Sequence, residues 1–230
     1  DAAKPIDIAA SRRDNDFVNR NLPNQITVGR VFLAAGFFVL LGLYQPGRAQ
    51  GPWLLNAAFI IYIVAGLSDV LDGWIARKYR ITSAFGRMID PIVDKILVVG
   101  AFAMLAGANF GDTAGGAAAA GIPAFLAGGM LSAVQGWMVV LVAGREFIVS
   151  GLRGYSESRN VEFPATWAGK LKMFLQSFAI CTVLFQLANL PEAHWAIWLK
   201  IAAVWLAVAV TVLSGLVYVR RAGVLFRSSE

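Results

Sequence analysis

Four aspartates stand in two pairs within a stretch that is otherwise rich in apolar residues. Asp69 and Asp72 are three residues apart. Asp90 and Asp94 are four apart, so on helices the members of each pair share one face. If two such helices met with these faces opposed, the four carboxylates would lie in one pocket, where protons or cations must neutralise them. Because ligation by oxygen alone favours Mg, Mn or Ca, the aspartates are candidate ligands of a divalent metal.

The composition indicates that membrane helices position these aspartates. Hydrophobic residues make up 58% of the chain and charged residues 15%, whereas a soluble domain is roughly 45–50% apolar and about 25% charged. At ~20 residues per span, the chain accommodates about six helices in one domain. We therefore expect an all-α integral membrane protein with about six transmembrane helices. The net charge of +6 is better explained by a basic membrane rim than by nucleic-acid binding.

Apolar runs separated by turn-forming residues predict where the spans lie. The expected spans are residues 26–44, 53–79, 84–106, 131–155, 167–188 and 195–219. Residues 1–22 form a polar segment that could lie as a helix on the membrane surface. Residues 23–222 form the membrane domain, and residues 223–230 form a tail.

Basic residues are distributed unequally between the two sides of this arrangement. With both termini on one side, the outer segments carry only Arg48 and, at a helix edge, Lys200. All other segments that hold Lys or Arg lie on the inner side, which is the positive-inside pattern for an even number of spans. This topology places both termini in the cytoplasm and the four aspartates near the cytoplasmic face, in a membrane that we expect to be a bacterial inner membrane.

The aspartates belong to a longer pattern of fixed spacing. The pattern resembles the complete signature of the CDP-alcohol phosphotransferases, and its residues are Asp69, Asp72, Gly73, Ala76, Arg77, Gly86, Asp90 and Asp94. The resemblance implies six membrane helices, a homodimer, and transfer of a phosphate-bearing group from a CDP-linked donor to an alcohol with release of CMP.

The resemblance also implies a role for each residue of the signature. Asp69, Asp72, Asp90 and Asp94 would bind Mg²⁺ or Mn²⁺, with two ions expected, and Asp94 would be the general base. The residues that would lie against the CDP group are Asp69, Asp72, Gly73, Ala76, Arg77 and Gly86. These roles are chemically reasonable, because small residues let a nucleotide approach the backbone and an arginine offers two donors to phosphate.

Three further stretches resemble one branch of that family, the phosphatidylglycerophosphate synthases. They are NLPNQITVGR at 21–30, DPIVDK at 90–95, and REFIVSGLR at 145–153 together with GKLK at 169–172. The implied reaction joins CDP-diacylglycerol and glycerol 3-phosphate into phosphatidylglycerophosphate and CMP. The residues expected to bind the acceptor phosphate are Arg145, Arg153, Lys170 and Lys172, with Glu146 able to orient an arginine. Asn24, Thr27 and Arg30 are candidates for lining the site, with helix capping and interface anchoring as alternatives.

Other interpretations of the same residues remain open. Another acceptor, inositol phosphate or phosphatidylglycerol, would also suit a basic site, and the inner Lys and Arg residues could serve only as topological anchors. A cation transporter could use clustered aspartates, although that function favours carboxylates near the middle of the membrane and a pathway to both sides. The expected partners are therefore CDP-diacylglycerol, glycerol 3-phosphate, membrane lipids and a second copy of the chain, and no nucleic acid.

Overall fold

The computed structural model describes the backbone of residues 22–79, 84–112, 121–159 and 167–227. Side chains are described for residues 27–71, 92–112, 121–156, 158–159 and 169–220. Within these ranges the chain is all-α, as predicted, and its few extended residues form only an isolated bridge between Gly111 and Met130. The long helices are α2 (Leu22–Leu43), α3 (Gly51–Tyr79), α4 (Ala84–Leu105), α7 (Gly136–Ser158), α8 (Trp167–Asn189) and α9 (His194–Arg227). A 3₁₀ turn, η1 (Ala108–Phe110), and a short helix, α6 (Ala124–Ala127), lie between α4 and α7.

Most helix ends lie within a few residues of the predicted span ends, with two exceptions. The last helix, α9, continues to Arg227, beyond the predicted end at 219 and into the predicted tail, and α7 begins later than predicted. The prediction began this span at residue 131, but residues 131–135 form a turn in which Ala133 has a φ of 60°. The Ser132 hydroxyl stabilises the turn by donating to the Leu105 carbonyl at 2.6 Å and accepting from the Val134 amide at 3.1 Å. The bond to Leu105 joins residues far apart in the chain, so the local apolar composition could not reveal it.

Within the described part of the chain, three helices contain segments that are long and apolar enough to cross a membrane. These segments are Gly51–Leu71, Gly169–Asn189 and His194–Arg220, and a shorter apolar segment, Thr27–Leu43, lies in α2. In α7 the apolar run is interrupted by Arg145, Glu146 and Arg153. Six crossings, the cytoplasmic position of the termini and the expected domain limits stay predictions.

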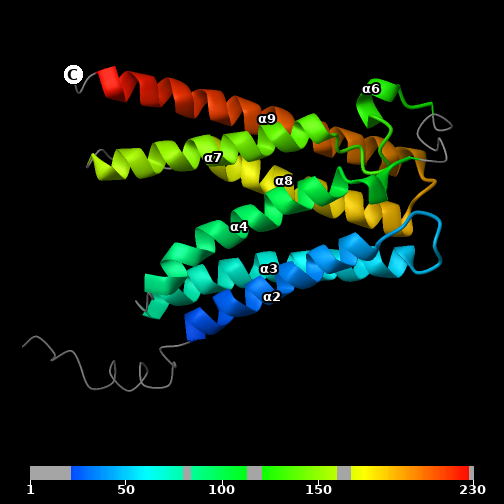
Figure 1. Cartoon of the computed structure of the whole chain (residues 1–230), viewed down its shortest axis with the longest axis horizontal. Helices are drawn as coiled ribbons and strands as arrows, with labels where there is room; N and C mark the ends of the chain where they lie inside the picture. The colour runs from blue at the N-terminus through cyan, green and yellow to red at the C-terminus, as the bar shows by residue number, and fades with distance from the viewer. Residues whose placement is uncertain (1–21, 80–83, 113–120, 160–166, 228–230) are drawn as a thin grey trace, which may run out of the picture.

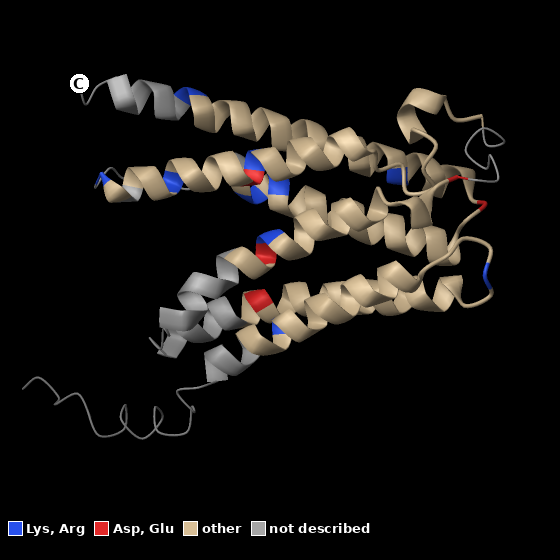
Figure 2. Cartoon of the chain, viewed as in Figure 1, with Lys and Arg blue, Asp and Glu red and all other residues tan. Residues whose placement is uncertain are grey.

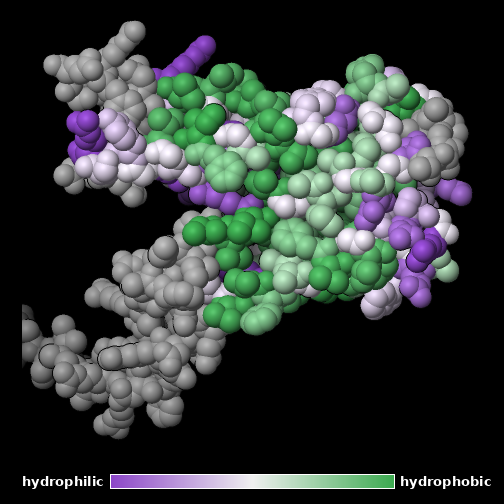
Figure 3. Space-filling view, viewed as in Figure 1, coloured by the Kyte–Doolittle hydropathy of each residue, from purple (hydrophilic) through white to green (hydrophobic). Residues whose placement is uncertain are grey.

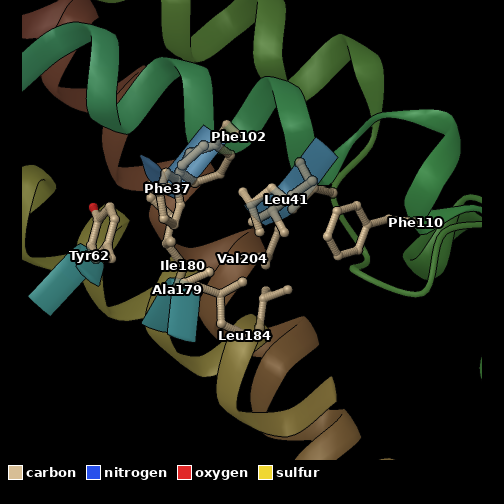
Figure 4. Packing of buried hydrophobic residues seen from close by; sticks show 14 of the residues in the cluster. Phe37, Leu41, Tyr62, Phe102, Phe110, Ala179, Ile180, Leu184 and Val204 are labelled. Atoms are coloured by element: carbon tan, nitrogen blue, oxygen red, sulfur yellow. The ribbon is translucent and has the colours of Figure 1, made fainter. Parts of the chain in front are cut away.

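The helices pack into a bundle in which α8 lies between two groups (Figure 1). α2 packs against α3 and α4, α7 packs against α9, and α8 contacts both α3 and α9. Phe37 and Leu41 of α2, Phe102 of α4, and Leu184 of α8 meet in the centre of the core (Figure 4). Small buried residues such as Ala58, Ala101 and Ala207 let the helices approach closely, which is how helices associate without a hydrophobic driving force in lipid.

The two ends of the bundle differ in character. At one end, called here the aspartate end, lie the start of α2, the end of α3, the start of α4 and the ends of α7 and α9 (Figure 1). The other end, called the far end, holds the α2–α3 connection, α6 and the α8–α9 turn. The charged residues that lie within helices gather mainly toward the aspartate end, as Figure 2 shows.

Candidate active site

Arg30 of α2 joins two of the signature aspartates. Its Nη1 atom lies 2.8 Å from Oδ1 of Asp69 on α3 and 3.3 Å from Oδ1 of Asp94 on α4. The Arg30 side chain is 0% exposed, whereas those of Asp69 and Asp94 are 41% and 31% exposed. The guanidinium is therefore inside the bundle, and the two carboxylates stand between it and the surroundings.

The sequence places these three residues by extending the buried face of each helix. On α2, Arg30 precedes buried Ala34, Phe37 and Leu41 at spacings of three or four residues. Residues at such spacings lie above one another on a helix, so the side chain of Arg30 enters the same interface as the core.

The same register holds on the two helices that carry the aspartates. On α3, Asp69 follows buried Tyr62 and Ala65. On α4, Asp94 precedes buried Leu97 and Ala101. The core that packs α2 against α3 and α4 thus also sets the distance between the carboxylates and Arg30.

The described carboxylates suit a divalent cation. Carboxylate oxygens of Asp69 and Asp94, from two different helices, already converge on the positively charged Nη1 of Arg30. Carboxylate oxygens are the ligands that Mg²⁺ and Mn²⁺ prefer. Among the side chains that the structure describes, no group of three or more possible metal ligands occurs. The side chains of Asp72 and Asp90 lie outside the described residues, but α3 and α4 are helical through both positions.

A second charged cluster is built from α7 and α8. Glu146 forms ion pairs with its neighbour Arg145, whose Nη1 is 3.2 Å from Oε1, and with Lys172 of α8. The side chains of all three residues are at most 10% exposed. Arg145 and Lys95, the latter on α4, both repel the Lys172 ammonium. The glutamate therefore partly neutralises a concentration of positive charge on α7 and α8, to which Lys95 of α4 adds. Figure 2 shows positively and negatively charged positions close together on these helices.

Tyr218 of α9 connects two arginines of α7. Its hydroxyl accepts a hydrogen bond from Nη2 of Arg153 at 3.0 Å, and the guanidinium carbons of Arg145 and Arg153 each lie 5.5 Å from the centre of its ring. Arg145 also donates from Nε to the Ser214 hydroxyl at 3.2 Å. Gly215 makes room for this arginine, since a Cβ there would lie 3.0 Å from Arg145 Cγ. Two arginines are thus held in fixed positions, and Arg153 remains exposed.

A hollow opens on the surface between α7 and the described part of α4. Figure 3 shows hydrophilic residues along this hollow, within a surface that is otherwise largely hydrophobic. The helices on its two sides, α4 and α7, carry Asp94 and the arginines of the basic cluster, respectively. The arrangement can bind a ligand with several negative charges near this carboxylate.

The remaining predicted residues are distributed as follows. Thr27 is buried on α2, and Lys170 is exposed and has no contact with the cluster among the described residues. The side chains that lie outside the described residues are those of Asn24, Asp72, Gly73, Ala76, Arg77, Gly86 and Asp90. Sequence reasoning missed the direct pairing of Arg30 with the aspartates, and it missed Ser214 and Tyr218 entirely. The polar spacing of Thr211, Ser214 and Tyr218 along one face of an apolar helix was the available signal.

Comparison with known proteins identifies relatives along almost the whole chain. Residues 20–213 match the family model described as CDP-alcohol phosphatidyltransferase. The chain is 30% identical over 209 residues to CDP-diacylglycerol–glycerol-3-phosphate 3-phosphatidyltransferase of Bacillus subtilis, which covers 86% of this chain and 93% of that protein. It is 29% identical over 204 residues to the protein of the same name in Rickettsia prowazekii, covering 87% and 94%. It is also 33% identical over 202 residues to a probable phosphatidylglycerophosphate synthase of Mycobacterium tuberculosis, covering 88% and 81%.

Proposed function

This chain belongs to the CDP-alcohol phosphatidyltransferase family, and we propose that it transfers the phosphatidyl group of CDP-diacylglycerol to glycerol 3-phosphate. The products are phosphatidylglycerophosphate and CMP. The observation that carries the choice of acceptor is the exposed Arg153, which Tyr218 holds in place and which offers its guanidinium donors to a phosphate, with the largely buried Arg145 beside the same ring. The names of the relatives support the same substrates.

Asp94 is the proposed general base. Its carboxylate is partly exposed and is oriented by the hydrogen bond from Arg30. In the proposed step it takes the proton of the acceptor hydroxyl while the hydroxyl oxygen bonds to the lipid-bearing phosphorus. The bond from that phosphorus to the oxygen of CMP breaks, and the electron pair leaves with CMP. No enzyme-bound intermediate is needed.

The four aspartates are the proposed metal ligands. Asp69, Asp72, Asp90 and Asp94 would hold one or two ions of Mg²⁺ or Mn²⁺, and Arg30 would keep Asp69 and Asp94 turned toward the same point. Bound divalent cations would neutralise the charge that develops on the departing CMP. Arg77 would pair with the diphosphate, while Gly73, Ala76 and Gly86 would leave space for the nucleotide.

The basic cluster is the proposed site of the acceptor phosphate. Arg153 is exposed and held by Tyr218, so it can bind a phosphate without first leaving a buried ion pair. Arg145 and Lys172 are already paired with Glu146, and they would contribute mainly by raising the local positive potential. Lys170 is exposed two residues before Lys172 on α8, on a different face of the helix, and would bind only if its flexible side chain turned inward.

The proposal includes a setting for the reaction. The excess of Lys and Arg at the aspartate end supports a position at the cytoplasmic face of a bacterial inner membrane, where a soluble acceptor and a lipid donor can meet. We also propose a homodimer, which size-exclusion chromatography with light scattering of the purified protein would test. A monomeric mass would exclude it.

The decisive assay supplies purified protein in detergent with CDP-diacylglycerol, Mg²⁺ and labelled glycerol 3-phosphate. We expect equal amounts of CMP and lipid-soluble label, loss of both with EDTA, and their return with excess Mg²⁺ or Mn²⁺. A parallel panel of inositol phosphate and phosphatidylglycerol tests the acceptor. CMP release with another acceptor but not with glycerol 3-phosphate would contradict the proposed substrate, and no CMP with any acceptor would contradict the proposed reaction.

A further inference from the structure

A cavity of about 430 Å³ lies at the far end of the bundle. Its walls come from the α2–α3 connection, from the residues around α6 and from the facing ends of α8 and α9. Along α3 the helix rise of 1.5 Å per residue separates Pro52, which lines the cavity, from Asp69 by ~25 Å. The cavity is therefore separate from the candidate active site.

The lining of this cavity is amphipathic. Most of the wall is apolar, with contributions from Ile122, Leu187 and Ile197. The charged residues among the lining are Arg48 and Lys200, and no carboxylate is among the described residues that form the wall. A ligand with an apolar part and a negative charge fits this lining.

Lys200 points to an anion because its charge is buried. The residue is only 5% exposed, and its Nζ atom donates to the Leu131 carbonyl at 2.5 Å. Asp112 attracts the ammonium but is not part of the cavity wall. Since an ammonium group has three N–H donors and loses its hydration on burial, an anion in the cavity would add a direct contact to those that the Leu131 carbonyl and the attraction of Asp112 provide.

Gln186 adds a requirement for a hydrogen-bond donor. It is 2% exposed, and its Nε2 donates to the carbonyls of Leu190 at 2.9 Å and Pro191 at 3.4 Å. These two carbonyls fix the orientation of the amide. Its Oε1 atom is buried and accepts no hydrogen bond from any described residue. A buried acceptor of this kind is costly, so a hydroxyl group on the ligand would be stabilised here.

The depth of the cavity indicates where the ligand comes from. Four exposed tryptophans begin helices at the same end of the bundle, namely Trp53 of α3, Trp137 of α7, and Trp195 and Trp198 of α9. Exposed tryptophans concentrate at the level of lipid headgroups. The cavity therefore lies at headgroup depth, on the side of the membrane opposite to the candidate active site.

We propose that this cavity binds the headgroup of an anionic phospholipid that carries free hydroxyl groups. The phosphate would contact Lys200 and Arg48, a hydroxyl of the headgroup would donate to Gln186, and the start of an acyl chain would lie against the apolar wall. This site is independent of the proposed transferase reaction, and its ligand need not be a substrate.

Photo-cross-linking of the full chain in detergent micelles tests this site. The probes are phosphatidylglycerol and phosphatidylcholine with the same diazirine-bearing acyl chain, and peptides are analysed by mass spectrometry. We expect phosphatidylglycerol, and not phosphatidylcholine, to label peptides that contain Met130 or Ile197, which line the cavity. In Lys200→Met the apparent affinity for the probe should fall roughly tenfold or more, because a hydrogen bond between charged groups is lost.

Two variants and one competitor make the result specific. Arg48→Gln changes an exposed loop residue, so it should fold normally and should also weaken labelling. Arg220→Gln removes an exposed charge at the aspartate end and should leave labelling unchanged. Equal labelling by phosphatidylcholine would overturn the proposal, because the cavity would then not select an anionic headgroup. Unchanged labelling in Lys200→Met, with only a lower melting temperature, would also overturn it and would show that the lysine is structural. Displacement of the probe by millimolar inorganic phosphate alone would also overturn it, since the site would then bind a free anion.

Discussion

Arg30→Met removes the guanidinium that contacts Asp69 and Asp94 and replaces it with an uncharged side chain of comparable length. In the wild type, one buried nitrogen donates to both carboxylates at 2.8 and 3.3 Å. A hydrogen bond between charged groups contributes about 1.5–3 kcal/mol. Because the two carboxylates are 41% and 31% exposed, solvent screens them, and we expect the sum to fall to about 2–3 kcal/mol.

The expected loss should be measurable in metal-free protein. For a chain of this size, 1 kcal/mol shifts the melting temperature by roughly 2–4 °C, so EDTA-treated Arg30→Met should melt roughly 4–12 °C below the wild type. Added Mg²⁺ should stabilise the variant more than the wild type, because in the variant Asp69 and Asp94 have lost the positive charge of Arg30. Turnover should fall as well, since Asp94 loses the group that orients it.

Matched variants separate this explanation from a general effect of charge. Arg220→Gln removes one exposed positive charge and should leave the melting temperature within about 1 °C of the wild type. Arg30→Lys keeps the charge but has a smaller, less suitable donor group, so its melting temperature should lie between those of the wild type and Arg30→Met. If Arg30→Met has the same melting temperature as the wild type in EDTA and gains no extra stability from Mg²⁺, then Arg30 does not hold the two carboxylates and the reasoning is wrong.

Three further substitutions test the proposed roles in the reaction. Asp94→Asn should reduce turnover, measured as CMP release, by about 10²–10⁴-fold, while a lipid-binding titration should show that CDP-diacylglycerol still binds. Retained turnover would exclude Asp94 as the general base. Arg153→Ala should raise the KM for glycerol 3-phosphate roughly tenfold or more and change that for CDP-diacylglycerol much less, with exposed Arg159→Ala as the control. Tyr218→Phe keeps the ring but removes the hydroxyl that accepts from Arg153, so the KM for glycerol 3-phosphate should rise by roughly 2–10-fold. An equal rise for both substrates in either variant would indicate a structural role.

The apolar runs were sufficient to predict the helical fold, and the spacing within each aspartate pair placed its members on one face, since a helix brings residues three or four apart together. The convergence of Asp69 and Asp94, which lie on different helices, was expected only on the condition that those faces meet, and the packing of α2 against α3 and α4 decides it. The pairing of Arg30 was missed because an arginine near the start of an apolar run is typical of an interfacial anchor. Its register with Ala34, Phe37 and Leu41 would have placed it in the core.

The basic cluster was only partly predictable, for a different physical reason. Arg145, Arg153 and Lys172 were expected near a phosphate, and Glu146 was expected to orient an arginine. The partners that fix their positions come from a distant part of the chain: Lys172 lies 26 residues from Glu146, and Tyr218 lies 65 residues from Arg153. Such contacts depend on how α7, α8 and α9 pack, and no local pattern reports that.

Packing of small residues explains how charges can be positioned inside an apolar bundle. Asp69 lies one turn beyond Ala65, and Asp94 lies on the face that contains Ala101; both alanines are fully buried. Because these side chains are small, α3 and α4 can approach their neighbours closely, and the carboxylates one or two turns further along come within hydrogen-bonding distance of Arg30. A larger residue at either alanine would separate the helices and therefore the charged groups. The geometry of the candidate active site thus depends on apolar helix contacts one or two turns away from the charged groups themselves.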